Sequence, residues 1–218
     1  MDKKSENLIL FLLVFFAIYC SLIMGMSWDE SYHYELGRNK LRYLLSFGKY
    51  EYQNFIYFAN IGHFPGFYDT LTAFISQMIP KKYEVQIHHL INLFFSFSAI
   101  LGISKISKII FNKKVSKIIF LIAFLNPIFF GHMSMNPIDT IIAFSNIWAT
   151  YFIIRYLQTH HLAFKRKYFS TLIGIIIGFG LGVRAIFLAT LLPIFILFFL
   201  DIFLLKIINN KKISFINF

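Results

Sequence analysis

The stretch that decides the fold is the apolar run Leu8–Met26 with the polar octet Ser27-Trp28-Asp29-Glu30-Ser31-Tyr32-His33-Tyr34 directly behind it. The run approaches the roughly 20 helical residues that cross a bilayer. It is longer than a signal-peptide core of about 7–15 residues, and no small-x-small cleavage site follows. We therefore expect a retained first transmembrane helix. The basic pair Lys3 and Lys4 before it predicts a cytoplasmic amino terminus.

The composition indicates an integral membrane protein with the lipid bilayer as a partner. Hydrophobic residues make up 58% of the 218 residues, against roughly 45–50% in soluble domains. The net charge of +11 comes from lysines and arginines that fall mostly between apolar runs. These charges therefore report topology, and no nucleic-acid partner is expected. The single cysteine, Cys20, lies inside the first apolar run and excludes an internal disulfide.

Further apolar runs predict an all-α polytopic membrane protein with about six transmembrane helices. After the first run come Val85–Ser104, 115–131, Pro137–Leu157 and the long block Thr171–Leu205, which needs two helices. No internal repeat or flexible linker divides the chain. We expect one membrane domain, 1–218.

The segment Gly66–Ile79 decides the topology, because it is apolar but covers only about 21 Å of a roughly 30 Å bilayer core. If it crosses, the lysine-rich segment 105–117 falls outside the cell. If it is re-entrant or interfacial, the whole excess of +11 lies in the cytoplasm and outer charges balance. The positive-inside rule favours the second choice. Residues 27–84 then form a long extracytoplasmic loop with juxtamembrane helices, beginning with an amphipathic helix that repeats Trp28, Tyr32, Leu36 and Tyr43.

The carboxylates of Asp29 and Glu30 have two interpretations that can both hold. Ser27-Trp28-Asp29-Glu30 fits a capping box, in which Glu30 reaches back to Ser27 and Asp29 suits the helix dipole. Paired carboxylates at a lipid–water boundary also suit proton abstraction or cation binding. His33, one helical turn after Asp29, is a candidate second member of a metal or proton-transfer pair.

Two later residues are expected on the same side of the membrane. Asn136-Pro137-Ile138-Asp139 opens a helix and places a third carboxylate, Asp139, at that depth. Arg184 follows a glycine-rich stretch between the last two helices, where it either snorkels to the surface or binds a phosphate. The spacing of Gly174, Gly178 and Gly182 favours close helix packing over a phosphate loop.

Taken together, these motifs resemble the GT-C glycosyltransferases, which include the protein O-mannosyltransferase-like and aminoarabinose-transferase-like enzymes. Four features carry the resemblance, in chain order: Asp29-Glu30; His63-Phe64-Pro65-Gly66-Phe67-Tyr68; Asn136-Pro137-Ile138-Asp139 after Asn126-Pro127-Ile128-Phe129-Phe130-Gly131-His132; and Gly182-Val183-Arg184. The family's Pro-Pro pattern is Pro65-Gly66 here.

The resemblance implies transfer of a sugar from a polyprenyl-phosphate donor to a hydroxyl of a glycan, lipid or protein acceptor at the extracytoplasmic face. It further implies a bacterial inner membrane location. Asp29 would be the general base, with Glu30 and Asp139 orienting it or sharing a divalent metal ion. Arg184 and His132 would steady the phosphate, with His33 and Tyr68 also contacting substrate. Metal dependence varies in this family and stays open.

Family members are about twice this length, so the chain corresponds to their amino-terminal catalytic module and is expected to be incomplete. Two alternatives follow from the sequence. One is a small transporter or flippase subunit for lipid-linked sugars, which would place acids at mid-membrane depth, where the predicted helices have none. The other is a non-catalytic fragment of a split enzyme.

Overall fold

The computed structural model describes residues 3–50, 65–159 and 162–208, and every regular element in these ranges is helical. The elements are α1 (Lys3–Ile23), α2 (Glu30–Leu45), α3 (Phe67–Ser76), the short 3-10 helix η2 (Lys81–Tyr83), α4 (Glu84–Ile110), α5 (Lys113–Leu125), α6 (Pro127–Met135), α7 (Asp139–Gln158), α8 (Ala163–Val183) and α9 (Phe187–Ile208). The predicted all-α fold is confirmed.

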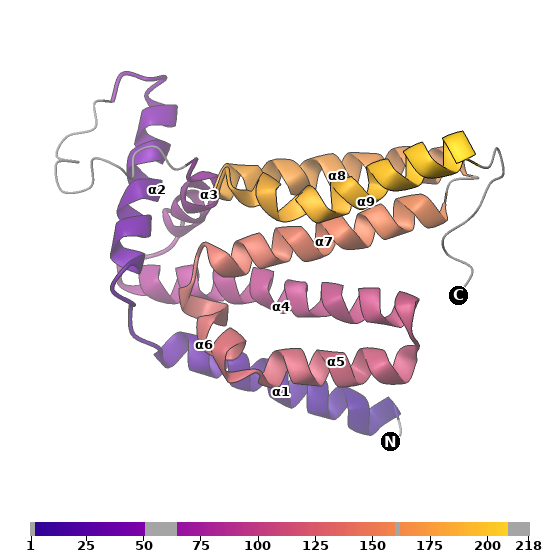
Figure 1. Cartoon of the computed structure of the whole chain (residues 1–218). Coiled ribbons are helices and arrows are strands. Elements are labelled where there is room, and N and C mark those ends of the chain that lie inside the picture. Colours follow the sequence, from indigo (N-terminus) through magenta and orange to yellow (C-terminus); the bar gives the residue numbers. More distant parts are fainter. Residues whose placement is uncertain (1–2, 51–64, 160–161, 209–218) are drawn as a thin grey trace.

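The long helices lie side by side in a layered bundle, with α4 and α7 in the middle (Figure 1). Helices α1 and α5 lie on one side of this pair, and α8 and α9 lie on the other. Helix α2 crosses one end of the bundle, with α3 between it and α8. We call this the crossed end. The α4–α5 turn marks the opposite, lysine-rich end.

Four helices in the described ranges are long and apolar enough to cross a membrane: α1, α4, α7 and α8. The predicted span 115–131 is instead two helices, α5 and α6, bent by 66°. The bend has a local cause, because Pro127 supplies no amide hydrogen and Asn126 before it is extended (ψ 117°) and caps α6 through a 2.9 Å bond from Phe129 N. If this pair is one broken span, the total is five.

The predicted sixth span falls on α9. Its apolar part within the described residues, Phe187–Ile196, is shorter than a span. Six spans therefore stay a prediction.

The described parts of residues 27–84 contain two short helices, α2 and α3, and their place in an extracytoplasmic loop stays a prediction. Trp28 lies before α2 and is 93% exposed, and Tyr43 is also exposed. The buried residues are Glu30, His33, Tyr34, Leu36, Gly37, Asn39 and Leu41. Of the predicted stripe, Leu36 faces the protein interior, and Gly37 beside it lets α2 approach α3, with Asp69 O only 2.1 Å from where a Cβ on Gly37 would lie.

The glycine spacing in α8 is only partly a packing feature. A Cβ on Gly182 would lie 2.7 Å from Phe67 Cβ, so this glycine lets α8 approach α3 closely. Gly174 and Gly178 have no atom within 4 Å of such a Cβ. The prediction of close packing holds at Gly182 and is wrong at the other two, which lie on a part of α8 that α3 does not reach.

Candidate functional site

The turn between α1 and α2 gives two neighbouring carboxylates different environments. Ser27 N donates to Glu30 Oε2 at 2.5 Å, which is the reach-back bond of a capping box. The Ser27 hydroxyl donates to Asp29 Oδ1 at 2.8 Å instead of capping the helix. Glu30 is 2% exposed, whereas Asp29 is exposed. The capping interpretation is thus half confirmed, and only Asp29 is accessible to a ligand.

Glu30 joins α2 to the bundle through His89 of α4. Glu30 Oε1 lies 2.8 Å from His89 Nε2, and His89 Nδ1 lies 3.0 Å from the Ser21 carbonyl oxygen at the end of α1. A carbonyl oxygen only accepts, so Nδ1 donates to Ser21 O, while Nε2 pairs with the Glu30 carboxyl group. Because both side chains are buried, this pair fixes the ends of three helices relative to one another.

Tyr34 completes the surroundings of Glu30. Its ring lies 3.9 Å from that of His88, centroid to centroid. Burial, reinforced by the charge of Glu30, raises the pKa of the Tyr34 hydroxyl well above its usual range. The hydroxyl therefore stays protonated, as a neutral neighbour of the Glu30–His89 pair.

His33 pairs with a residue other than the predicted one. His33 Nδ1 lies 3.3 Å from the carboxylate of Asp69 in α3, and both side chains are buried. Burial lowers the pKa of nearby Lys40, and the charge of Asp69 opposes that shift. Lys40 Nζ also donates to Pro65 O at 3.0 Å. These contacts fix α3 on α2.

Asn92 of α4 is a buried junction among four helices. It accepts from the Tyr68 hydroxyl at 3.2 Å and from Thr140 Oγ1 at 3.3 Å. Its amide nitrogen donates to the carbonyl oxygens of Met133 at 3.1 Å and Asn136 at 2.9 Å. Asn92 thereby holds the α6–α7 turn against α3 and α4. Tyr68, predicted to contact substrate, is 2% exposed and serves here as a donor to Asn92.

The α6–α7 turn presents Asp139, His132 and Arg184 together. Asn136 Oδ1 accepts from Ile138 N and Asp139 N at 3.1 and 2.8 Å, so the predicted cap is present. Asn136 Nδ2 donates to Asp139 Oδ2 at 3.1 Å and lies 3.5 Å from His132 Nδ1. Arg184 Nη1 is 4.0 Å from Asp139 Oδ1, with both side chains largely exposed.

This polar turn lies at the end of a groove of about 810 Å³ formed by α4, α5, α6 and α7. Its walls are mostly aliphatic, with isoleucines at 100, 103, 119, 122 and 147. Asn126, His132, Asn136 and Asp139 contribute the polar part of the lining. The groove thus combines a long apolar channel with a polar end, the shape that an amphiphile with one chain requires.

The predicted residues therefore fall into separate contacts at the crossed end of the bundle. Asp139, His132 and Arg184 gather at one turn, whereas Asp29 contacts Ser27, and Glu30, His33 and Tyr68 are buried. His63 and Phe64 lie outside the described residues. Among the described residues, no group of three or more His, Cys, Asp or Glu side chains is arranged to hold a metal ion, and metal dependence stays open.

Sequence reasoning missed His89, Asn92 and Ser96, which form one polar stripe on α4. Ser96 donates to Met133 O at 3.0 Å, next to the bonds of Asn92. A spacing of three and then four residues places all three on one helical face. The sequence does contain a signal for them. Polar residues at this spacing inside an apolar run predict a helix face that points into the protein, because polar groups in a membrane helix avoid lipid.

The fold and these contacts define an all-helical protein with apolar helices of membrane-spanning length and polar clusters at its crossed end. Comparisons with models of protein families, with curated proteins and with solved structures find no match.

Proposed function

We propose that the chain is a GT-C-type glycosyltransferase that moves a sugar from a polyprenyl-phosphate donor to an acceptor hydroxyl at the extracytoplasmic membrane face. The observation that carries the proposal is the apolar groove ending at His132, Asn136 and Asp139, with Arg184 beside Asp139. A prenyl chain fits the aliphatic walls, and its phosphate then lies at the polar end.

In this proposal Arg184 binds the donor phosphate. A guanidinium presents paired donors that match phosphate oxygens, and Arg184 is exposed enough to exchange the distant carboxylate of Asp139 for a ligand. His132, exposed at the groove, is the second phosphate contact. Asp139 keeps Arg184 oriented while the site is empty.

Asp29 is the proposed general base, because its carboxylate is exposed at the same end of the bundle. The acceptor oxygen attacks the anomeric carbon as its proton passes to Asp29. The bond from that carbon to the phosphate oxygen breaks, and polyprenyl phosphate leaves with the electron pair. Arg184 stabilises the negative charge that develops on the phosphate.

Glu30 is proposed as a positioning residue, since its carboxylate is buried and bonded to His89 and to Ser27 N. The pair holds the α1–α2 turn and so the position of Asp29. His33 and Asp69 have the same role for α3.

The proposed topology retains six spans, with α9 as the sixth, the amino terminus in the cytoplasm and a bacterial inner membrane as the location. The orientation follows from the lysines at 105, 108, 113, 114 and 117, near the α4–α5 turn and so at the end opposite to the α1–α2 turn. The location rests on the family resemblance.

The first test is donor binding. The full chain in POPC nanodiscs is titrated with undecaprenyl phosphate and, in parallel, with undecaprenol, which lacks the phosphate. We expect the phosphate to bind at least about tenfold more tightly, and Arg184→Gln to remove that preference because one charge-assisted contact is lost. Arg38→Gln is the matched control. Arg38 Nη1 lies 2.7 Å from Glu84 Oε1, and neither residue lines the groove. Equal binding of the two lipids contradicts the proposal.

The second test is transfer. Proteoliposomes receive undecaprenyl-phosphate-linked mannose or aminoarabinose together with a hydroxyl-bearing glycan, lipid or protein acceptor, and acceptor-dependent release of undecaprenyl phosphate is measured. Asp29→Asn is expected to lower the rate by roughly 100-fold or more while leaving donor binding unchanged. Donor movement between leaflets without release of undecaprenyl phosphate supports a flippase instead. Unchanged release by folded Asp29→Asn excludes Asp29 as the base.

A further inference from the structure

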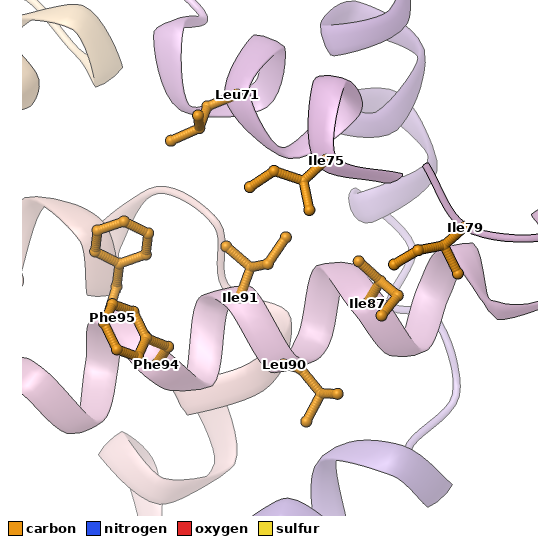
Figure 2. A pocket seen from close by; sticks show the side chains of 8 residues that line it. All are labelled: Leu71, Ile75, Ile79, Ile87, Leu90, Ile91, Phe94 and Phe95. Atoms are coloured by element: carbon orange, nitrogen blue, oxygen red, sulfur yellow. The ribbon is translucent and has the colours of Figure 1, made fainter. Parts of the chain in front are cut away.

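A second hollow, the α3–α4 wedge, lies where α3 leans across the first turns of α4 (Figure 2). Its volume is about 370 Å³, and all eight lining side chains are apolar, among them Leu71 and Ile75 of α3 and Ile87 and Ile91 of α4. Side chains from the two helices point toward one another without filling the space. None of them is shared with the groove at the α6–α7 turn.

The wedge is open at its margin. Phe94, which lines it, is 68% exposed. An apolar hollow with such a rim is unfavourable against water but is favourable against hydrocarbon chains. Helix α4 is long and apolar enough to span a membrane, which is compatible with lipid chains at this surface.

Two lysines lie at one end of the wedge. Ile79 lines it, and the chain continues through Pro80 into Lys81 and Lys82 of η2, both exposed. Lys82 Nζ lies 4.7 Å from the centroid of the Tyr83 ring. The nearest acid in sequence, Glu84, is bonded to Arg38 at 2.7 Å, so it does not neutralise the lysines. In the proposed topology these two lysines lie on the extracytoplasmic side, where the positive-inside rule does not predict basic residues. Their charge therefore calls for another explanation.

We propose that the α3–α4 wedge binds an acyl chain of an anionic phospholipid whose phosphate is held by Lys81 and Lys82. The apolar walls take up the chain, and the basic pair selects the charge of the headgroup. The bound lipid completes the packing of α3 on α4. This site is independent of sugar transfer, because it shares no residue with the groove.

The test uses the full chain in POPC vesicles that contain a small fraction of phosphatidylglycerol with a photoreactive group in one acyl chain. Phosphatidylcholine with the same reactive chain is the parallel probe. After illumination, mass spectrometry is expected to find the label on peptides from α3 and the first half of α4. Phosphatidylglycerol should label roughly 25-fold more than phosphatidylcholine, since each of the two lysines near the headgroup contributes about a fivefold preference.

Two pairs of variants test separately the contribution of the lysine charges and that of the apolar hollow. Lys81→Gln with Lys82→Gln should reduce labelling by phosphatidylglycerol to the level of phosphatidylcholine, whereas Lys113→Gln with Lys114→Gln, at the lysine-rich end, should leave it unchanged. Ile91→Trp should fill the wedge and reduce labelling by both lipids. Ile118→Trp, on the exposed face of α5, should not.

Equal labelling by the two lipids in the parent chain overturns the proposal, as does labelling confined to other helices. Crosslinks between copies at the wedge would identify a protein interface in place of a lipid site. The lysine variants alter only exposed side chains, so the charge test remains decisive if Ile91→Trp fails to fold. None of these outcomes depends on transferase activity.

Discussion

The two halves of α4 are held in different ways. Its first half, toward the crossed end, carries His89, Asn92 and Ser96, which hydrogen-bond to α1, α2, α3, α6 and α7. Its second half packs through Gly102, whose absent side chain admits Ile147, and through the reciprocal hydroxyl bonds of Ser104 and Ser116. The first half is thus bonded to five other helices, whereas the hydrogen bonds described for the second half reach α5 and α7. The candidate site lies at the half with the more extensive polar network.

The largest effect is expected from breaking the Glu30–His89 pair. Glu30→Ala leaves the buried His89 and Ser27 N without their partner and should lower the free energy of unfolding by roughly 3–5 kcal/mol. Asp29→Ala, one residue earlier but exposed, should change it by less than about 1 kcal/mol. Denaturation in mixed micelles measures both. Equal effects would remove the distinction between the two carboxylates.

The next largest effect is expected from Asn92→Ala, at roughly 2–3 kcal/mol, because it removes the partner of the buried Tyr68 hydroxyl and one of the two donors to each of the Met133 and Asn136 carbonyl oxygens. Its control is Ser107→Ala in the other half of α4, where one bond to Ile103 O is lost. That variant should cost no more than about 1 kcal/mol. The same denaturation experiment tests whether the polar half of α4 is the more sensitive half.

A pair of glycine variants should move stability in opposite directions. Gly37→Ala places a Cβ 2.1 Å from Asp69 O, so α3 must shift, at a cost of about 2 kcal/mol. Gly174→Ala meets no atom within 4 Å and should stabilise α8 by up to about 1 kcal/mol. A neutral Gly37→Ala would show that α2 and α3 are less tightly fixed than the rest of the crossed end.

The smallest effect is an alkaline pH dependence of the crossed end. Burial raises the pKa values of Tyr32, Tyr34 and Tyr68 in the folded protein, so above about pH 10 the unfolded state binds fewer protons than the folded state. This contribution is complete below that pH and is lost as pH rises. Unfolding followed from pH 9 to 11 should show a shallower loss for Tyr34→Phe than for the parent. An identical slope would mean that Tyr34 titrates normally.

The sequence predicted the outline of the site better than its contacts. Asp139, His132 and Arg184 were expected together and do gather. The Asn136-Pro137 helix start explains the position of Asp139, whereas Arg184 reaches it through the packing of α8 on α7. The partners of Glu30 and His33 were not predicted. They are His89 and Asp69, which lie 59 and 36 residues away along the chain, and no local periodicity links such positions.

The amino-acid sequence by itself determined that the chain is helical and apolar enough to cross a membrane, because these properties depend on composition and on runs of neighbouring residues. It also placed the capping turn at Ser27–Glu30, which is a local effect. The break at Asn126-Pro127 was not predicted, although its cause is local as well. Only the tertiary structure decided that Glu30 is buried while Asp29 stays exposed, and that α2 buries a polar face. Those outcomes depend on which helices meet, and a polar group in an apolar bundle is stable only where a distant partner satisfies it.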